Sequence, residues 1–295
     1  MVRGTGLSAE KERPAERGGA TRSPTPPATT PSAIEVRASS ATAKRSRALR
    51  LVILPLFILA LWQLSAELKL YNTILLPPPD RVATSAWRLI VSGELLRHIG
   101  DSLRRIAIAN FVAFITAVPL GILMGRYRAF EDFMDGFLNI IRPIPPLAWI
   151  PLAILWFGLG ENSVVFITLI SAFFALLINT IAGVRSVDKS LPRAALTLGA
   201  SQRDVIKDII VPATLPHIFT GLRIALGVSW MSIVAAELIA ASSGLGYMIS
   251  YYREVLRSDL ILVGMLSIGL IGFAMDRGLV WLEHRLLPWR TRLEM

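Results

Sequence analysis

The chain has 295 residues, of which 53% are hydrophobic and only 18% are charged, and its formal net charge is +10. Soluble globular chains are about 45–50% apolar and about 25% charged, so this composition indicates a membrane protein and excludes an ordinary aqueous domain. The absence of cysteine also excludes disulfides, thiol catalysis and cysteine-ligated metal sites.

The first 47 residues differ in composition from the rest of the chain. They are rich in Pro, Ser, Thr, Ala and Gly and have no apolar periodicity, which predicts a disordered, basic cytoplasmic tail. Glu10, Glu12, Glu16 and Glu35 argue against a transit peptide, because such peptides contain few acidic residues. The apolar stretch that follows is long for the core of a signal peptide, so we interpret it as a retained first membrane helix.

Six segments after this tail predict membrane-spanning helices, because a helix needs about 20 mostly apolar residues to cross the hydrocarbon core. The expected fold class is therefore an all-α, polytopic membrane protein with one membrane domain over 48–290. The third segment contains R-P-I-P-P-L-A-W-I-P-L and predicts a broken helix, since proline removes a backbone donor. The predicted spans are about 48–67, 103–125, 133–157, 162–183, 217–240 and 259–281.

Lys and Arg residues predict the orientation of these spans. They concentrate in the tail, after the second span, between the fourth and fifth spans, and at the C-terminus. Both termini and the polar segment 185–216 are therefore predicted to be cytoplasmic. The long outer loop, 68–102, is predicted to hold an interfacial helix that packs on the bundle.

The polar segment 185–216 interrupts the apolar runs. Within it, Gly199 predicts the end of a helix, and Ser201, followed three residues later by Asp, predicts the capped start of a second short helix. Pro212 and Pro216 are expected to stop that second helix before the next span. From these residues alone, the segment is either a simple connector or a rigid projection that docks on a cytoplasmic partner.

The same segment resembles the cytoplasmic signature of ABC-importer permeases: Glu-Ala-Ala, three residues, Gly, nine residues, Ile-x-Leu-Pro. Both intervals are kept, but Arg193 replaces the Glu and Val211 replaces the Leu. Arg193 reverses a charge, which puts in doubt any ion pair built on the family's Glu. Longer stretches, 141–163, 198–249 and 256–289, resemble permeases for nitrate, sulfonates and taurine. The resemblance assigns contact with an ATPase to Arg193, Ala194, Ala195, Gly199, Ala200, Ser201, Ile209 and Pro212.

The resemblance implies a division of labour between several proteins. Two permeases, preferably two copies of this chain, would form a pathway for a small anion of the sulfonate, taurine or nitrate type. Two cytoplasmic ATP-binding subunits would dock on the permeases, and an extracytoplasmic solute-binding protein would deliver the substrate. The expected location is the bacterial inner (plasma) membrane, in contact with lipid and without a nucleic-acid partner.

The chain itself is then expected not to be an enzyme. It contains no G-x-x-x-x-G-K-[ST] sequence, the loop that cradles nucleotide phosphates. No cofactor is therefore expected in this chain, and ATP with Mg²⁺ would belong to the partner. His98, His217 and His284 share no metal-ligand spacing, so neither a metal site nor a catalytic residue is predicted.

Ionisable residues within membrane spans are costly and often mark a substrate pathway. Arg142 and Glu237 are the candidates for this role: the first would attract an anion, and the second would act as a gate or pairing residue. For each residue the sequence favours, over this role, a structural interpretation in which a neighbouring group satisfies the charge or the residue lies nearer an interface. A direct pair between the two is a further possibility that one sequence does not decide.

Two other classes of function are weighed against the importer. A stand-alone secondary transporter or channel would be favoured by internal repeats, and none is evident. An intramembrane enzyme needs a nucleophile beside a base, or paired carboxylates, whereas the predicted spans offer Glu237 and Asp276 as separate residues.

Overall fold

The computed structural model describes residues 53–288, and all regular elements among them are helices. The chain divides into two units, 1–57 and 58–295, and the architecture given below is that of the described part of the second unit. The predicted first span, 48–67, lies partly outside the described residues, and its described part belongs to the helix Ile53–Glu67. The predicted tail, 1–47, lies wholly outside them.

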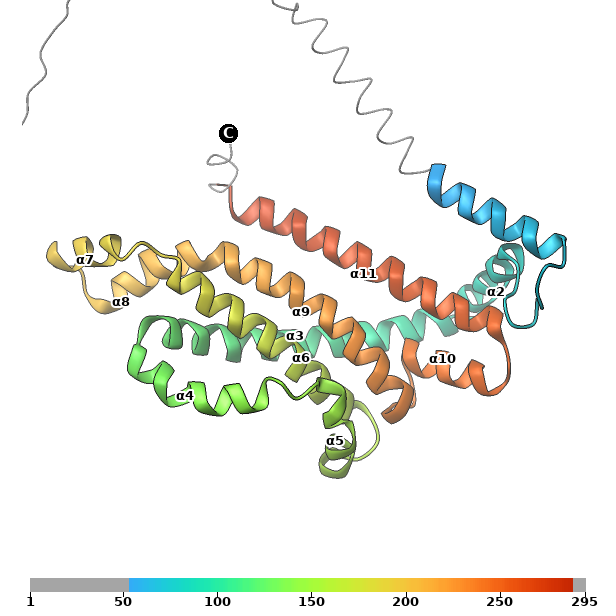
Figure 1. The fold of residues 1–295 in the computed structure, drawn as a ribbon, viewed down its shortest axis with the longest axis horizontal. Helices are drawn as coiled ribbons and strands as arrows, with labels where there is room; N and C mark the ends of the chain where they lie inside the picture. Colours follow the sequence, from blue (N-terminus) through green and yellow to red (C-terminus); the bar gives the residue numbers. More distant parts are fainter. Residues whose placement is uncertain (1–52, 289–295) are drawn as a thin grey trace, which may run out of the picture. The chain divides into compact units, whose positions relative to one another are not determined.

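The helices follow one another with short connections (Figure 1). Their bounds are α2 Pro79–Val91, α3 Glu94–Arg126, α4 Arg128–Ile141, η1 Pro146–Trp149, α5 Ile150–Phe157, α6 Glu161–Arg185, α7 Ser190–Thr197, α8 Gln202–Asp204, η2 Val205–Ile210, α9 Val211–Ala240, α10 Leu245–Glu254 and α11 Ser258–Leu286.

Four helical stretches in the described part are long and apolar enough to cross a membrane: α3, α6, the stretch Gln202–Ala240 and α11. A fifth is present if α4 and the η1–α5 stretch form one broken span, since the two are bent by 80°. The bend lies at Pro143, Pro145 and Pro146, the residues from which the sequence predicts a broken helix. The all-α membrane fold is thus confirmed, while the count of six spans stays a prediction.

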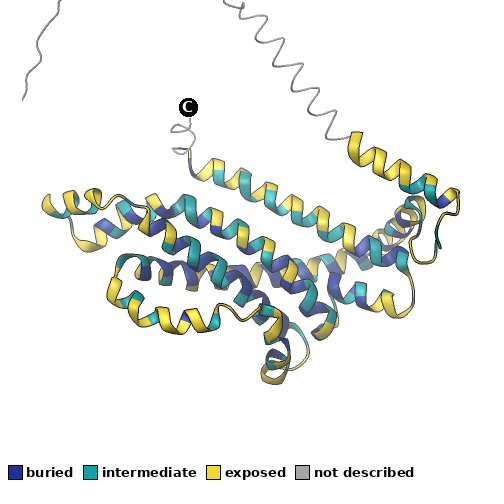
Figure 2. Ribbon diagram, in the orientation of Figure 1, coloured by how far each residue is buried: buried dark blue, intermediate teal, exposed yellow. Residues whose placement is uncertain are grey.

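Helix α6 lies between α3 and α9 and makes the most extensive contacts with both (Figure 1). Buried residues gather along these three helices, whereas α4 and α11 expose much of their surface (Figure 2). Many large apolar residues lie on these exposed faces, among them Phe133 and Phe137 of α4 and Leu270 and Phe273 of α11. In a membrane, such faces meet lipid instead of water.

Two glycines let α3 approach α6 closely. A Cβ atom at Gly121 would lie 2.7 Å from Cβ of Thr180, and one at Gly125 would lie 2.6 Å from Cβ of Val184. Both separations are far shorter than a van der Waals contact. The spacing of four residues on each helix is the small-xxx-small pattern that brings membrane helices together.

The helix that contains the second predicted span begins earlier than expected. Helix α3 starts at Glu94, nine residues before the predicted start at 103, because Gly93, with φ +76°, breaks the chain there instead. The predicted interfacial helix is correspondingly confined to α2. As expected, α2 packs on the bundle, and the hydroxyl of Ser85 donates to Asp259 on α11 over 2.6 Å.

The expectation that Pro212 and Pro216 stop a helix was wrong. The chain is helical without interruption from Gln202, through the π-helix η2, to Ala240. Pro212 occupies the first turn of α9, directly after the wider π-turn, where the hydrogen-bond pattern already changes. Pro216 lies inside α9, as packed membrane helices permit.

Replacing Gly125 by Ala should destabilise the bundle, because the new methyl group would overlap Val184 on α6. The expected cost is about 1–3 kcal/mol, seen as a lower midpoint in thermal unfolding of the purified protein in detergent. Gly136→Ala on α4 is the matched control, since a Cβ atom there meets nothing within 4 Å. Equal midpoints for the two variants would contradict close packing at Gly125.

Candidate functional site

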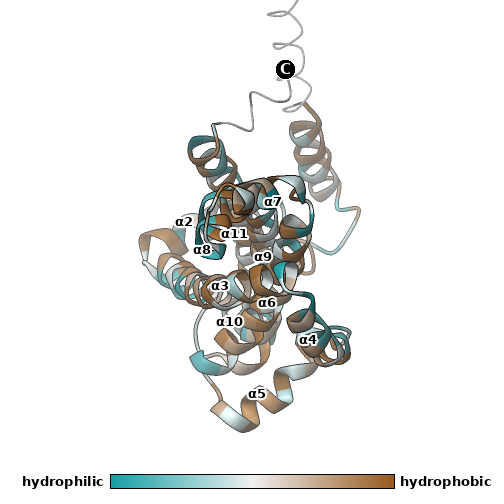
Figure 3. Cartoon of the chain, turned by 90° about the vertical axis from the view of Figure 1, so that its left-hand side faces the viewer, coloured by the Kyte–Doolittle hydropathy of each residue, from teal (hydrophilic) through white to brown (hydrophobic). Residues whose placement is uncertain are grey.

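The polar segment 185–216 lies at the end of the bundle marked by Arg126, whose guanidinium donates to Gln202 over 2.9 Å. Hydrophilic residues gather on the α8 turn in the view from this end, while α5 is almost wholly hydrophobic (Figure 3). The segment therefore contrasts in polarity with the helices behind it.

A glycine turn ends α7. Gly199 has φ +94°, a conformation that L side chains rarely adopt. Its N–H donates to the carbonyl of Leu196 over 3.1 Å, and the N–H of Ala200 donates to the carbonyl of Ala195 over 3.0 Å. This pair of bonds is the Schellman motif, so the helix ends at the predicted glycine.

Side-chain hydrogen bonds fix the backbone after this turn and before α7. The N–H of Asp204 donates to Oγ of Ser201, and the N–H of Ser201 donates to Oδ2 of Asp204 over 2.9 Å. This is the capping box that the sequence predicts. Before α7, the amide of Ser190 donates to Asp188 over 2.9 Å, and this bond, with the hydroxyl of Ser190, holds the pKa of Asp188 below its usual value.

A small core anchors the segment to the bundle. Val184 of α6 and Val205 and Ile210 of η2 are buried together, and Ala195 and Ala200 pack against them. The small size of these two alanines therefore brings α7 close to helices of its own chain.

The exposed tip of the segment consists of Leu198 and Gly199. Leu198 is 88% exposed, and a Cβ atom at Gly199 would meet nothing within 4 Å. Leu198 is not among the contact residues predicted from the sequence, because nothing local marks this leucine as exposed. Of the other predicted contact residues, those exposed are Arg193, Ala194 and Ser201, and those half-buried are Ile209 and Pro212.

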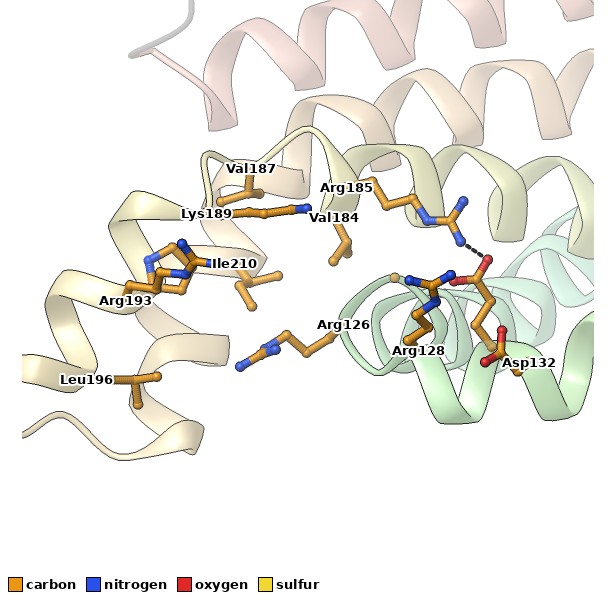
Figure 4. Close-up of a pocket in the computed structure, with 13 residues that line it drawn as sticks. Arg126, Arg128, Asp132, Val184, Arg185, Val187, Lys189, Arg193, Leu196 and Ile210 are labelled. Atoms are coloured by element: carbon orange, nitrogen blue, oxygen red, sulfur yellow. Dashed lines mark hydrogen bonds and ion pairs between the residues drawn. The ribbon is translucent and has the colours of Figure 1, made fainter.

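A basic cavity of about 700 Å³ opens between α7 and the neighbouring ends of α3, α4 and α6 (Figure 4). Arg185 pairs there with Glu131. Because basic side chains outnumber acidic ones, the cavity favours negative charge. Its charged lining residues are Arg126, Arg128, Arg185, Lys189, Arg193, Glu131 and Asp132.

A buried ion pair lies toward the opposite end of the bundle. Nη1 of Arg105 on α3 donates to Oε1 of Glu237 on α9 over 2.8 Å, and the two side chains are 4% and 0% exposed. The hydroxyl of Ser102 lies 2.8 and 2.9 Å from the two carboxylate oxygens. The guanidinium of Arg105 also donates to the carbonyl and the hydroxyl of Ser243.

The same carboxylate holds the start of α10. The N–H of Gly246 donates to Oε2 of Glu237 over 2.8 Å, the preceding amide donates to Ser102, and the N–H of Gly244 donates to Nδ1 of His98. These amides have no partner within their own helix. A Cβ atom at Gly244 would lie 2.2 Å from Oε1 of Glu237, so the loop requires glycine there.

Comparison with known proteins identifies the chain. Residues 117–288 match the family described as "Binding-protein-dependent transport system inner membrane component". The chain belongs to this family. It is therefore a multi-pass membrane permease of an ABC importer.

Two relatives of the permease are named for a substrate. The "Taurine transport system permease protein TauC" of Escherichia coli K12 is 39% identical over 242 residues, which cover 80% of this chain and 88% of the relative. The "Nitrate import permease protein NrtB" of Synechococcus elongatus is 31% identical over 250 residues, with shares of 80% and 88%.

A solved structure agrees in fold. A chain of the MetNI methionine ABC transporter, in an inward-facing conformation, matches the permease with a TM-score of 0.53 at 20% identity. The match covers 63% of the permease and 94% of that chain. At this identity the likeness concerns the fold alone.

The two predicted pathway residues of the permease lie in different surroundings. Arg142 is exposed at the end of α4, and the ion-pair partner of Glu237 is Arg105 instead of Arg142. A neighbouring group thus compensates the charge of Glu237, which is the arrangement that its structural interpretation describes. Sequence reasoning missed Arg105 and also Arg223, although each lies within a predicted span and could have been found as an intramembrane charge.

Replacing Glu237 by Gln should destabilise the permease strongly, because Arg105 would keep a buried charge without its carboxylate. The expected loss is about 3–5 kcal/mol in denaturant unfolding of the protein in detergent. Glu161→Gln breaks the exposed pair with Arg104 and should cost at most about 1 kcal/mol. Equal losses for the two variants would show that the buried pair has no special importance.

Proposed function

We propose that this permease imports a small solute of the sulfonate, taurine or nitrate type by alternating access, driven by a separate ATPase. The capped segment 185–216, with the exposed tip Leu198–Gly199, is the observation on which the coupling part of this proposal rests. Its backbone is held by the Schellman motif and the capping box, so it can transmit a force instead of yielding to it. The relatives named for taurine and nitrate support the class of solute.

Family membership implies an ATPase and a binding protein as partners. We infer that two ATP-binding subunits dock on the cytoplasmic segments of two permeases, preferably a homodimer, while an extracytoplasmic solute-binding protein delivers the solute. ATP and Mg²⁺ are then used by the ATPase, and this chain is a transport subunit.

The orientation follows from the positions of the basic residues. The cavity beside α7 gathers Arg126, Arg128, Arg185, Lys189 and Arg193 at one end of the bundle. Because positive charge favours the cytoplasmic side, this end is inside, and both termini are proposed to be cytoplasmic. The membrane is proposed to be the bacterial inner membrane.

The continuous helix from Gln202 to Ala240 provides a path for the movement. One end adjoins the exposed tip, and Glu237 near the other end contacts both α3 and the start of α10. When ATP brings the docked subunits together, a rigid rotation of this helix would move both ends at once. The ion pair then serves as a joint that keeps α3, α9 and α10 in register. We therefore propose that Glu237 positions helices and that Arg142 attracts the anionic group of the solute.

Replacing Gly199 by Trp tests the docking. Apart from its chain neighbours, none of the described residues lies within 4 Å of a Cβ atom at Gly199, so the indole has room to project from this chain toward a partner. We expect the variant to lose copurification with the ATPase and the stimulation of ATP hydrolysis, because the cleft of the partner no longer accepts the tip.

Gly158→Trp is the matched control for the docking experiment. Gly158 also has a positive φ, +75°, and open space around it, but it lies between α5 and α6, away from α7. Backbone strain is therefore present in both variants. If Gly199→Trp binds the ATPase as well as Gly158→Trp does, the segment is only a connector.

A further inference from the structure

A second cavity, of about 250 Å³, opens between α9 and α11. Arg223 lies 12 residues after the start of α9 at Val211, which is about 18 Å along the helix. The cavity is therefore within the length of the spanning helices. Its lining residues are Arg223, Leu226, Gly227, Trp230, Ile268, Gly269, Gly272, Phe273, Met275 and Asp276.

Glycines create the space in this cavity. A Cβ atom at Gly227 or Gly269 would meet nothing within 4 Å, and one at Gly272 would lie 3.7 Å from Nε1 of Trp230. The two helices therefore leave room where larger side chains would close the gap. A water molecule occupies about 30 Å³ in the liquid, so the volume suits a small solute.

Charged groups of opposite sign reach into the same space. Nε of Arg223 lies 3.3 Å from Oδ1 of Asp276, and Nη2 lies 3.2 Å from Glu283. The side chains of Arg223 and Asp276 are 41% and 47% exposed, so their contact leaves surface on both available to a ligand. Charges at this depth are costly, and those that persist commonly serve a pathway.

An indole N–H adds a donor without an acceptor. Trp230 is only 8% exposed, and its buried Nε1 atom has no hydrogen-bond partner among the residues that the structure describes. Buried polar groups are nearly always hydrogen-bonded. This donor, at the wall of a cavity that also contains a guanidinium, indicates that a ligand oxygen completes the site.

The balance of charge selects the class of ligand. The lining has one cation, Arg223, and one anion, Asp276. Two further charged groups lie nearby: the carboxylate of Glu283, which pairs with Arg223, and the guanidinium of Arg277, which stacks on Phe273. Because charges of both signs surround the cavity, a bare anion gains no net attraction there. A solute with both an ammonium and an anionic group meets a partner for each.

We propose that this cavity binds a small zwitterionic aminosulfonate of the taurine type on its way through the permease. The sulfonate accepts hydrogen bonds from the guanidinium of Arg223 and the indole N–H of Trp230, and the ammonium donates to Asp276. Charge-assisted bonds of this kind are the strong ones. The inference rests on the proposed import function and narrows its substrate from small anions in general to a solute with both charges.

Equilibrium binding of radiolabelled taurine to the full-length permease in lipid nanodiscs tests the site, without a binding protein and both with and without the ATPase. Ethanesulfonate, which lacks the ammonium, and nitrate serve as competitors. In the wild type we expect taurine to bind at least about tenfold more tightly than either competitor, because only taurine engages Asp276.

Two variants separate the two ends of the ligand. Asp276→Asn should weaken taurine binding about tenfold or more and strengthen ethanesulfonate binding, because the carboxylate that attracts one repels the other. Trp230→Phe keeps the ring, removes the N–H, and should weaken both sulfonates alike. Asp135→Asn, an exposed carboxylate on α4, is the control and should change neither.

A structural role for the charges predicts a different pattern. Taurine binding no tighter than that of ethanesulfonate or nitrate in the wild type would overturn the inference. The inference would also be overturned if Asp276→Asn weakened the binding of taurine and of ethanesulfonate equally. An ion pair that only joins α9 to α11 has no preference for a ligand with an ammonium group. Failure of the ATPase to associate would refute the proposed coupling separately, because taurine binding is measured in its absence as well.

Discussion

A charge inside a membrane persists only where another group in the protein compensates it, and this constraint links the main features of the permease. Arg105 and Glu237 compensate each other between α3 and α9, and the second oxygen of the carboxylate accepts the N–H of Gly246 at the start of α10. Without this pair, three helices would lose their common contact. Both side chains of this ion pair are buried, so no water can substitute for a missing partner there.

Close helix packing and charge pairing support each other in this fold. Gly121 and Gly125 bring α3 against α6, and α6 in turn packs along α9. In contrast, the glycines at 227 and 269 leave space beside Arg223 and Asp276. The same residue type thus permits close contact at one interface and leaves a cavity at another, because a neighbouring helix approaches only the first pair of glycines.

The segment 185–216 is rigid for local reasons. The turn at Gly199, the capping box at Ser201 and the small core around Val205 each fix a different part of it. A helix that continues from this segment to Ala240 joins the polar end of the molecule to the buried ion pair. In the proposed coupling, this connection is the mechanical path from the docked ATPase to the opposite end of the bundle.

The sequence by itself determined the membrane class, the helical fold, the break at the prolines of 143–146, and the turn and cap around Gly199. These are local signals, carried by apolar length and by residues a few positions apart. Only the tertiary structure decided the partner of Glu237, because Arg105 lies 132 residues earlier in the chain. It also decided that the helix continues past Pro212, since a π-turn directly before that residue changes the hydrogen-bond pattern, and that Leu198 faces outward, since the turn at Gly199 ends the helix beside it.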